Sequence, residues 1–380
     1  MNLEEIRLEI DKVDNEMIKL FDQRMDLAAQ VAAYKKENGL GVYDPKRERE
    51  KLRTLAEQLP EDKREYVYCL YSLIFELSRC SQSRIINNGG EMSKIIQEAL
   101  EKTPKMLPSA PTVACQGVEG AYSQIACERV FSNPGIFYFK DFEAVFTAIE
   151  KGLCRYGIIP LENSTAGSVN KVYDLMHKHK FNIVRSVRIK IDHNLLANKG
   201  AKLEDIKEIY SHEQAISQCG EFLRSLKGVE VIACENTAVA AKMVAESGRK
   251  DIAALSSRSC ASLYGLDCLA ESVQDVGNNY TRFICISKEL EIYPGADHTS
   301  LMMVIPHTPG SLYKVLSRFY ALGLNLNKLE SRPMPDRNFE FMFYFDLEVP
   351  VYSPNLLQMM DELKDMSDKF NYLGSYSEVI

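Results

Sequence analysis

The chain has 380 residues, enough for two or three domains, and its 46% hydrophobic and 26% charged residues are the composition of an ordinary soluble protein. Its net charge of −7, from 46 basic and 53 acidic side chains, argues against general nucleic-acid binding, which needs a basic surface. The N-terminus lacks the apolar region of a signal peptide and no run of 18 apolar residues occurs, so we expect neither secretion nor a membrane span. The ten cysteines form no C-x-x-C pair, which favours reduced thiols and a cytoplasmic protein.

The first 34 residues predict one long helix with a heptad seam, because their apolar residues recur at alternating steps of three and four. The seam consists of Leu3, Ile6, Ile10, Val13, Met17, Leu20, Leu27, Val31 and Tyr34. Arg24 interrupts it in the middle. A guanidinium between helices costs several kcal/mol unless an anionic group meets it. The position therefore indicates a bound anion or, as the alternative, a coiled-coil dimer in which a polar residue sets the register.

Further charged and polar residues fall on inward-facing positions of this helical region, which we place at residues 1–86. Lys35 lies about three turns after Arg24 and shares its face. Arg7 lies roughly 100° away around the helix and would serve the same pocket only from a partner helix. The other candidates are Asp44, Arg47 and Glu48 at the start of a second helix, and Ser78 and Gln82, one turn apart, in a third.

This spacing resembles the all-helical chorismate mutase family, whose three-helix protomers interlock as dimers. The residues that carry the resemblance are Arg7, Arg24, Lys35, Asp44, Arg47, Glu48, Ser78 and Gln82. The family reaction, chorismate to prephenate, needs no nucleophile, only a site that holds a compact conformer and stabilises charge on the ether oxygen. The implied roles are carboxylate binding by Arg7 and Arg24, donation to the ether oxygen by Lys35 and Gln82, orientation of the hydroxyl by Glu48 with the Asp44 backbone, and completion of the binding shell by Arg47 and Ser78.

Glycine and proline breakers predict a linker at 87–110, and residues 111–290 then alternate β-rich and helical runs, which is an α/β pattern. Four motifs stand out in this region: GVEGAYSQ from Gly117, ENSTAGSV from Glu162, SHEQA from Ser211 and NNYTRF ending at Phe283. The first opens a helix at Tyr122, Ser123 and Gln124, whose N–H groups are able to bind an anion. The second ends a buried strand, where open sheets bind ligands. The alternative is that these polar residues are turn and cap residues and that His212 is structural.

Together, GxxGAYSQ, ENSxxGSV and TRF resemble the prephenate dehydratase family, whose fold has two α/β lobes like a periplasmic binding protein, with the site in the cleft. The resemblance implies an active site with Asn163, Ser164, Gln214 and Thr281, substrate contacts from Ser123, Thr165 and Ser211, and Glu162 and Glu235 near the cleft. Thr281 is the expected donor to the departing hydroxyl, Asn163 and Gln214 would bind carboxylate and keto groups, and Arg282 would be a nearby cation. Glu213 stands where the family more often has proline.

Residues 299–378 read strand, helix, strand, strand, helix, strand, which suits an α+β ferredoxin-like unit. PHTPGSLYKVL and ESRP resemble the ACT domain, which in this family binds phenylalanine. The implied effector residues are Gly310, Ser311, Leu312, Glu330, Ser331, Arg332 and Pro333. Two departures are Ser311 in place of the usual alanine and Phe339 in place of a tryptophan. The alternative is a unit that serves only dimerisation.

We therefore expect a multidomain enzyme that converts chorismate to prephenate and prephenate to phenylpyruvate, with feedback inhibition by phenylalanine. It should form a homodimer or higher homo-oligomer. No metal-ligand constellation or G-x-G-x-x-G motif occurs, so we expect no metal and no cofactor. The alternative function is a non-catalytic sensor, with a two-lobed ligand-binding module, an ACT domain and a helical dimeriser. The inward Arg24, Lys35 and Glu48 argue against it, because a dimeriser does not need them.

Overall fold

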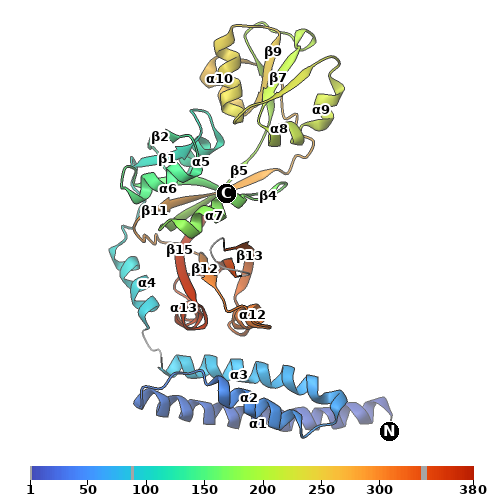
Figure 1. The fold of residues 1–380 in the computed structure, drawn as a ribbon, viewed down its shortest axis with the longest axis vertical. Coiled ribbons are helices and arrows are strands. Elements are labelled where there is room, and N and C mark those ends of the chain that lie inside the picture. Colours follow the sequence, from blue (N-terminus) through green and yellow to red (C-terminus); the bar gives the residue numbers. More distant parts are fainter. Residues whose placement is uncertain (1, 87–89, 335–339) are drawn as a thin grey trace. The chain divides into compact units, whose positions relative to one another are not determined.

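The structure is a computed structural model that describes residues 2–86, 90–334 and 340–380 (Figure 1). Its contacts divide the chain into two compact units. Unit 1 comprises Met1–Glu98 and Leu301–Asn371, and unit 2 comprises Ala99–Ser300 and Tyr372–Ile380. Among the helices of the described residues, none has both the length and the apolar character needed to cross a membrane.

The N-terminal part of unit 1 is entirely helical. Its elements are α1 (Leu3–Glu37), α2 (Pro45–Ala56), a 3₁₀ turn (Glu61–Lys63) and α3 (Arg64–Ile86). Helix α1 begins with a capping box, in which Asn2 accepts from the Glu5 backbone N–H at 2.8 Å and the Glu5 carboxylate accepts from the Asn2 N–H at 2.9 Å. Both α1 and α2 pack against α3. The three helices therefore form one small layer centred on α3.

The predicted apolar seam of α1 is open in the single chain. Its nine apolar residues are each 42–62% exposed, and the buried positions of α1 are Ala28 and Ala32. The helix turns a face of small residues toward α3, because alanine lets two helices approach closely, and leaves its bulkier seam in solvent. A seam of this length without a cover is unusual for a monomer.

The C-terminal part of unit 1 has the predicted strand–helix–strand–strand–helix–strand order. Its elements are β12 (His298–Val304), α12 (Ser311–Ala321), β13 (Asn325–Pro333), β14 (Phe341–Glu348), α13 (Pro354–Met366) and β15 (Lys369–Val379). The strand order is β13-β14-β12-β15, with β13 and β14 antiparallel. The last residues of β15 belong to unit 2, where Ser377–Val379 pair in parallel with β5.

Helix α4 (Glu91–Lys102) occupies the middle of the predicted linker. Its first turn is anchored in unit 1, because the Met92 N–H and the Ser93 hydroxyl both donate to the buried Asp361 carboxylate at 2.9 Å. A carboxylate at a helix N-terminus stabilises the unpaired N–H groups there. The predicted linker thus contains an amphipathic helix, Glu91–Lys102, whose first turn is capped by unit 1.

Unit 2 contains two α/β lobes, as predicted. The first lobe has β1 (Thr112–Gln116), α5 (Tyr122–Val130), β2 (Gly135–Phe139), α6 (Phe142–Glu150), β3 (Tyr156–Asn163), β4 (Gly167–Ser168), α7 (Asn170–Lys178), β5 (Asn182–Lys190) and β11 (Tyr280–Ser287). The second has β6 (Asn194–Ala197), β7 (Glu208–Ser211), α8 (Glu213–Gln218), α9 (Gly220–Ser225), β8 (Glu230–Ala233), α10 (Thr237–Ser247), β9 (Ile252–Ser256), α11 (Arg258–Tyr264) and β10 (Asp267–Ala270). Their sheet orders are β15-β5-β11-β3-β1-β2 and β10-β6-β9-β7-β8.

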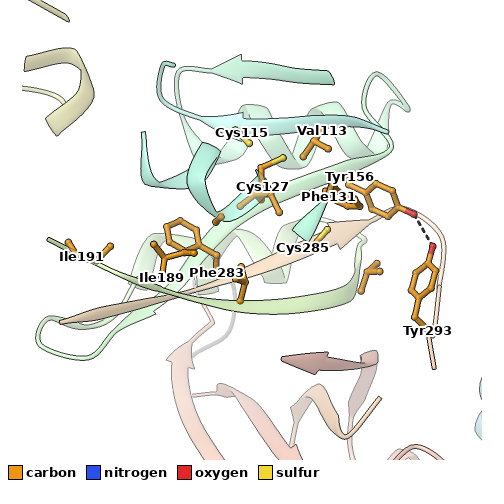
Figure 2. Packing of buried hydrophobic residues seen from close by; sticks show 14 residues of the cluster. Val113, Cys115, Cys127, Phe131, Tyr156, Ile189, Ile191, Phe283, Cys285 and Tyr293 are labelled. Atoms are coloured by element: carbon orange, nitrogen blue, oxygen red, sulfur yellow. Dashed lines mark hydrogen bonds between the residues drawn. The ribbon is translucent and has the colours of Figure 1, made fainter. Parts of the chain in front are cut away.

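The core of the first lobe lies between its sheet and α5 (Figure 2). Val113, Phe131 and Phe283 are at most 4% exposed there, and each large side chain stabilises the fold by about 2–3 kcal/mol through burial. The hydroxyl of buried Tyr156 hydrogen-bonds Glu291 at 2.5 Å and the Tyr293 hydroxyl at 3.1 Å. This core holds β3 and β11 side by side, and both strands carry site residues.

Candidate active sites

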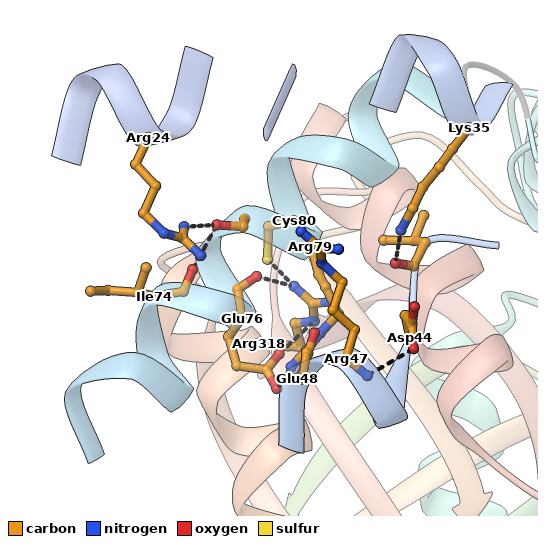
Figure 3. Close-up of polar contacts among 12 residues, drawn as sticks. Arg24, Lys35, Asp44, Arg47, Glu48, Ile74, Glu76, Arg79, Cys80 and Arg318 are labelled. Atoms are coloured by element: carbon orange, nitrogen blue, oxygen red, sulfur yellow. Dashed lines mark hydrogen bonds and ion pairs between the residues drawn. The ribbon is translucent and has the colours of Figure 1, made fainter. Parts of the chain in front are cut away.

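The first candidate site lies where α1 meets α3 (Figure 3). The Arg24 guanidinium donates to the Ser78 hydroxyl, and its Cζ lies 5.4 Å from the centroid of the Phe75 ring. Ser78 is buried and donates to the Ile74 carbonyl at 2.8 Å. Burial lowers the pKa of Arg24, although Tyr71 and Glu48 oppose the shift. The structure therefore turns Arg24 into the helical layer, as its seam position predicted.

Lys35 lies further along the same helix and also points inward. Its Nζ donates to the Val42 carbonyl at 2.6 Å. Burial lowers the pKa of Lys35, while the negative charges of Asp44 and Glu48 raise it and Arg47 lowers it. Lys35 thus shares one neighbourhood with the charged residues at the start of α2.

The polar residues of α2 and α3 take different positions in this site. The Asp44 carboxylate caps α2 by accepting from the Arg47 N–H at 3.0 Å, while the Arg47 side chain is exposed. The Gln82 Oε1 atom is buried and has no hydrogen-bond partner among the described residues. A buried amide oxygen without a partner costs free energy, which a ligand would recover only by donating to it. Donation to a substrate oxygen would come from the Nε2 of Gln82 instead.

Arg7 was also predicted to belong to this site, but within one chain it lies far from Arg24. It is exposed and lies seventeen residues before Arg24 on the same helix, which at 1.5 Å per residue is about 25 Å along the axis. No side chain spans that distance. Arg7 would therefore have to come from another copy of the chain.

Sequence reasoning missed Glu76 and Arg79 of α3. Arg79 donates through Nη1 to both carboxylate oxygens of Glu48 and through Nη2 to Glu76, with its side chain 9% exposed. Burial lowers the pKa of Arg79, but Glu76 and Glu48 outweigh burial and the pKa is raised. The available signal was the presence of two charges, three residues apart, inside the apolar run of α3.

The second candidate site is a cavity of about 540 Å³ between the two lobes of unit 2. Predicted residues from four elements line it: Ser123 of α5, Asn163 at the end of β3, Gln214 of α8 and Thr281 of β11. Glu235 and His212 also line it, and the His212 Nδ1 accepts from the Gln214 N–H at 3.2 Å as the N-cap of α8. The four sequence motifs thus converge on one cleft.

Asn163 is the most completely bonded residue of the cleft. Its Oδ1 accepts from the N–H groups of Thr165 and Ala166, at 3.1 and 2.9 Å, and from the Thr165 hydroxyl at 2.7 Å. Its Nδ2 donates to the Thr281 Oγ1 at 2.9 Å. Because that hydroxyl oxygen accepts from the amide, its own hydrogen is available to donate into the cavity.

A second amide chain continues from Asn163 into the other lobe. Asn163 donates to Asn279 at 2.7 Å, Asn279 donates to Gln218 at 2.9 Å, and Gln218 donates to Thr165 at 3.0 Å. The Nε2 of buried His193 lies 3.0 Å from the Gln218 Oε1, and burial lowers the pKa of His193. The imidazole is therefore neutral and donates from Nε2. Sequence reasoning missed these residues, although Asn279 and Gln218 lie within or next to the NNYTRF and SHEQA motifs.

Arg282 and Glu162 were predicted at the cleft, and the structure places both elsewhere. Successive residues of a strand point to opposite faces, so Thr281 and Phe283 line the cavity and Arg282 does not. Arg282 is 6% exposed and lies 3.4 Å from Glu162 and 3.1 Å from Glu378. It also donates to the hydroxyls of Ser186 at 2.9 Å and Tyr376 at 3.1 Å. A guanidinium with these partners holds β11 to the end of β15 and cannot serve as a substrate cation.

Two other predicted residues, and one glycine of the GVEGAYSQ motif, have structural roles. The Ser164 hydroxyl donates to the Asn278 carbonyl at 3.1 Å and accepts from the Tyr280 N–H at 2.9 Å. The fully buried Ser211 hydroxyl donates to the Leu255 carbonyl at 2.8 Å. Gly120 has φ +88°, and a Cβ there would lie 2.8 Å from the Cys260 sulfur, so its close approach is to the second lobe and not to a ligand.

The third candidate site is a cavity of about 360 Å³ at the start of α12. Ser311 and Leu312 line it together with Phe341 and Phe343. Gly310 precedes the helix with φ +84°, a conformation that favours glycine. The predicted residues of β13, Glu330, Ser331, Arg332 and Pro333, pair with β14 and do not line this cavity. Phe339 lies outside the described residues.

Comparison with known proteins gives matches over the whole chain. A family model for prephenate dehydratase matches residues 113–291, and a model for type II chorismate mutase matches residues 6–83. The chain is 30% identical to the bifunctional chorismate mutase/prephenate dehydratase of Aquifex aeolicus (strain VF5), with 100% of this chain and 98% of that protein covered. It is 37% identical to arogenate dehydratase 2 of Petunia hybrida, over 70% of this chain and 71% of that protein.

Among solved structures, a prephenate dehydratase from Arthrobacter aurescens in complex with L-Phe superposes with a TM-score of 0.65. It is 26% identical and covers 70% of this chain and 90% of its own.

Replacing Arg282 tests its structural role. We expect Arg282→Met to destabilise unit 2 by about 1–3 kcal/mol, because Glu378 loses one of its two arginine partners and buried hydrogen bonds to Ser186 and Tyr376 are lost. Urea unfolding of the full chain, followed by circular dichroism, measures the change. Arg188→Met is the matched control, since Arg188 also contacts Glu378, at 2.7 Å, but is 49% exposed and should contribute about 0–1 kcal/mol. A strongly raised KM for prephenate in Arg282→Met, with unchanged stability, would instead make Arg282 a substrate ligand.

Proposed function

Because the chain belongs to the family of bifunctional chorismate mutase/prephenate dehydratases, we propose that it converts chorismate to prephenate at the helical site and prephenate to phenylpyruvate in the two-lobed cleft, under feedback inhibition by phenylalanine. The chorismate mutase region, residues 6–83, and the prephenate dehydratase region, residues 113–291, are separate parts of the chain. We place the protein in the cytoplasm, on the expectation from its ten scattered cysteines.

The observation that carries the mutase assignment of residues is that Arg24 and Lys35 both turn inward and both interact with the charge of Glu48. Arg24 and Lys35 are both pulled from solvent far enough for burial to lower their pKa, which a helical layer does not need for stability. Chorismate carries two carboxylates, and Arg24 would bind one of them. Lys35 and Gln82 would donate to the ether oxygen as negative charge develops there.

Glu48 would orient the substrate hydroxyl beside the Asp44 backbone, with Arg47 and Ser78 completing the binding shell. No residue has to form a covalent bond or transfer a proton. A rate enhancement of about 10⁶-fold, or roughly 8 kcal/mol, is within reach of positioning and electrostatic stabilisation alone.

The remaining substrate carboxylate would be bound by Arg7 of a second copy. Within one chain Arg7 is about 25 Å from Arg24 along the helix, and the seam that carries Arg7 is exposed. A homodimer in which two α1 helices pair would cover this seam and complete both sites at once. The apolar residues of the seam supply the hydrophobic contact for such an interface.

In the dehydratase cleft, Thr281 is the proposed donor to the departing hydroxyl. The ring C–O bond and the bond to the carboxyl carbon both break, carbon dioxide leaves, and the electron pair enters the new aromatic ring. The departing hydroxide needs a hydrogen-bond donor. Asn163 donates to the Thr281 oxygen, and this orients the Thr281 hydroxyl hydrogen toward the cavity. Because a threonine hydroxyl is a weak acid, its contribution is mainly electrostatic. Gln214 would bind a carboxylate or keto oxygen from the opposite lobe.

We propose that residues 299–378 form an ACT domain with phenylalanine as its effector. Its element order agrees with that domain, and the apolar cavity beside Leu312 and Phe343 suits an aromatic side chain. The dehydratase from Arthrobacter aurescens, with a similar fold, was solved with L-Phe bound. Ser311 in place of alanine adds a hydroxyl at the mouth of the cavity, where it hydrogen-bonds Thr308 at 2.8 Å.

Two substitutions separate the two catalytic activities. Thr281→Ala should lower the dehydratase kcat by about 10²–10³-fold, because it removes one oriented donor, and leave the mutase unchanged. Thr281→Ser should retain most of the activity. Arg24→Ala should lower the mutase kcat/KM by about 10³-fold and leave the dehydratase unchanged. Steady-state assays of both reactions on each purified variant measure this. Parallel loss of both activities in either variant would contradict the assignment.

Complementation between two inactive variants tests the shared mutase site. Arg7→Ala and Arg24→Ala should each lack mutase activity as homodimers. Co-expressed, they should regain about a quarter of the wild-type activity, because half of the dimers are mixed and one of the two sites in each mixed dimer keeps both arginines. No recovery in purified mixed dimers would show that Arg7 and Arg24 act within one chain. An active Arg7→Ala homodimer would show that Arg7 plays no part.

Changing the proposed effector cavity should weaken the response to phenylalanine. Leu312→Asp should raise the phenylalanine concentration for half-inhibition of the dehydratase at least about tenfold, since it puts a charge into an apolar pocket. Tyr320→Asp is the control, because Tyr320 is on the same helix and 80% exposed. Calorimetric titration of phenylalanine into each protein gives the affinity directly. Equal inhibition of wild type and Leu312→Asp would place the effector elsewhere.

A further inference from the structure

A network of buried charges extends from Glu48 into α3 (Figure 3). Glu76 and Arg79 are 2% and 8% exposed, so neither charge is solvated and each depends on its partners. Arg79 donates to both oxygens of Glu48 with one nitrogen and to Glu76 with the other. Its guanidinium also lies over the Tyr43 ring, 5.0 Å from the centroid. Arg79 is therefore the cation that sets where the Glu48 carboxylate lies.

A second arginine, Arg318 of α12, holds the far end of this network. It is 2% exposed, and its Nη1 donates to the Glu76 carbonyl at 2.9 Å and to the Cys80 sulfur. Its Nε lies 3.4 Å from the Glu76 Oε2 and 3.3 Å from the Glu362 Oε2. The two oxygens of Glu76 thus face different arginines. Oε1 accepts a hydrogen bond from Arg79, and Oε2 forms an ion pair with Arg318 without a hydrogen bond.

This division gives Arg318 an influence on Glu48 without contact between them. The Glu76 carboxylate lies between two arginines, which restricts it to one position. The Arg79 guanidinium bridges Glu76 and Glu48, so it moves when either carboxylate moves. If Arg318 were lost, Glu76 would no longer be held from the α12 side and would rotate toward Arg79. The geometry of the Arg79 bond to Glu48 would change with it. The cost of leaving these charges unpaired keeps the network intact in the native fold.

We propose that Arg79 is a positioning residue for Glu48 in the mutase reaction and that Arg318 sets the position of Arg79 through Glu76. The inference rests on the proposed role of Glu48 in orienting the chorismate hydroxyl. Arg318 lies seven residues after Ser311, on the helix that begins at the proposed effector cavity. A shift of α12 on effector binding would therefore reach the mutase site through this network.

Mutase kinetics of Arg79→Met, Arg318→Met and the double variant, all in the full-length chain, test the proposal. Arg79→Met should lower kcat by about 10²-fold with little change in KM, because a misplaced catalytic group costs on that order. Arg318→Met should lower kcat by about tenfold. The double variant should be within about twofold of Arg79→Met, since both act through one route. Multiplied effects in the double variant, or unchanged kcat in Arg79→Met, would overturn the proposal.

Controls separate positioning from loss of structure and from failure of the proposed Glu48 role. Urea unfolding of each variant, followed by circular dichroism, reports whether the helices of unit 1 are folded, because Arg79 and Arg318 both lie in unit 1. Arg53→Met, which changes a 74% exposed arginine of α2, should behave as wild type. Glu48→Gln should itself lower the mutase kcat, and an unchanged kcat in this variant would contradict the proposed role of Glu48. A lowered kcat in Glu48→Gln with an unchanged kcat in Arg79→Met would contradict only the positioning role of Arg79. Should Arg79→Met not fold, Arg79→Lys replaces it, because lysine keeps the charge but lacks the two-nitrogen fork and should recover kcat only in part.

Discussion

The free energy of burying a charged side chain is the constraint on which both enzymatic regions depend. Arg79 lies between Glu48 and Glu76, and Arg282 lies between Glu162 and Glu378, each with little exposure to solvent. A single buried charge costs several kcal/mol, so each arginine is stable only while its carboxylates stay in place. These ion pairs hold α2 against α3 around Arg79, and β11 against β3 and β15 around Arg282. The backbone that carries the site residues is therefore rigid in both places.

Rigid surroundings suit the chemistry that we propose. Neither reaction needs a covalent intermediate or a metal from these residues, so the catalytic contribution comes from donors and cations held where charge develops. Asn163 shows this in the dehydratase cleft: four hydrogen bonds within its own lobe fix the amide that orients the Thr281 hydroxyl. In the mutase site, Arg79 has the corresponding part with respect to Glu48. Each site thus combines a residue that faces the substrate with a neighbour that fixes its direction.

Two features of the fold are incomplete in the single chain, and the same second copy would complete both. The apolar seam of α1 has no cover, and Arg7 has no route to Arg24. In the homodimer that we propose, pairing of α1 helices would bury the seam and deliver Arg7 in one step, so that mutase activity would depend on assembly. The dehydratase cleft needs no such help, because all the residues that line it belong to unit 2 of one chain.

The amino-acid sequence by itself determined the element types, the mutase and dehydratase regions, and several residues that line the cleft between the two lobes. Periodicity and the motifs are local, and Ser123, Asn163, Gln214 and Thr281 all line the cleft as their motifs indicated. Only the tertiary structure decided which face of β11 each residue uses, so that Arg282 leaves the cleft while Thr281 enters it. It also decided the partners of Glu76, whose contact with Arg318 joins residues 242 positions apart. Pairing of buried charges depends on how elements pack, and no local pattern along the chain records that.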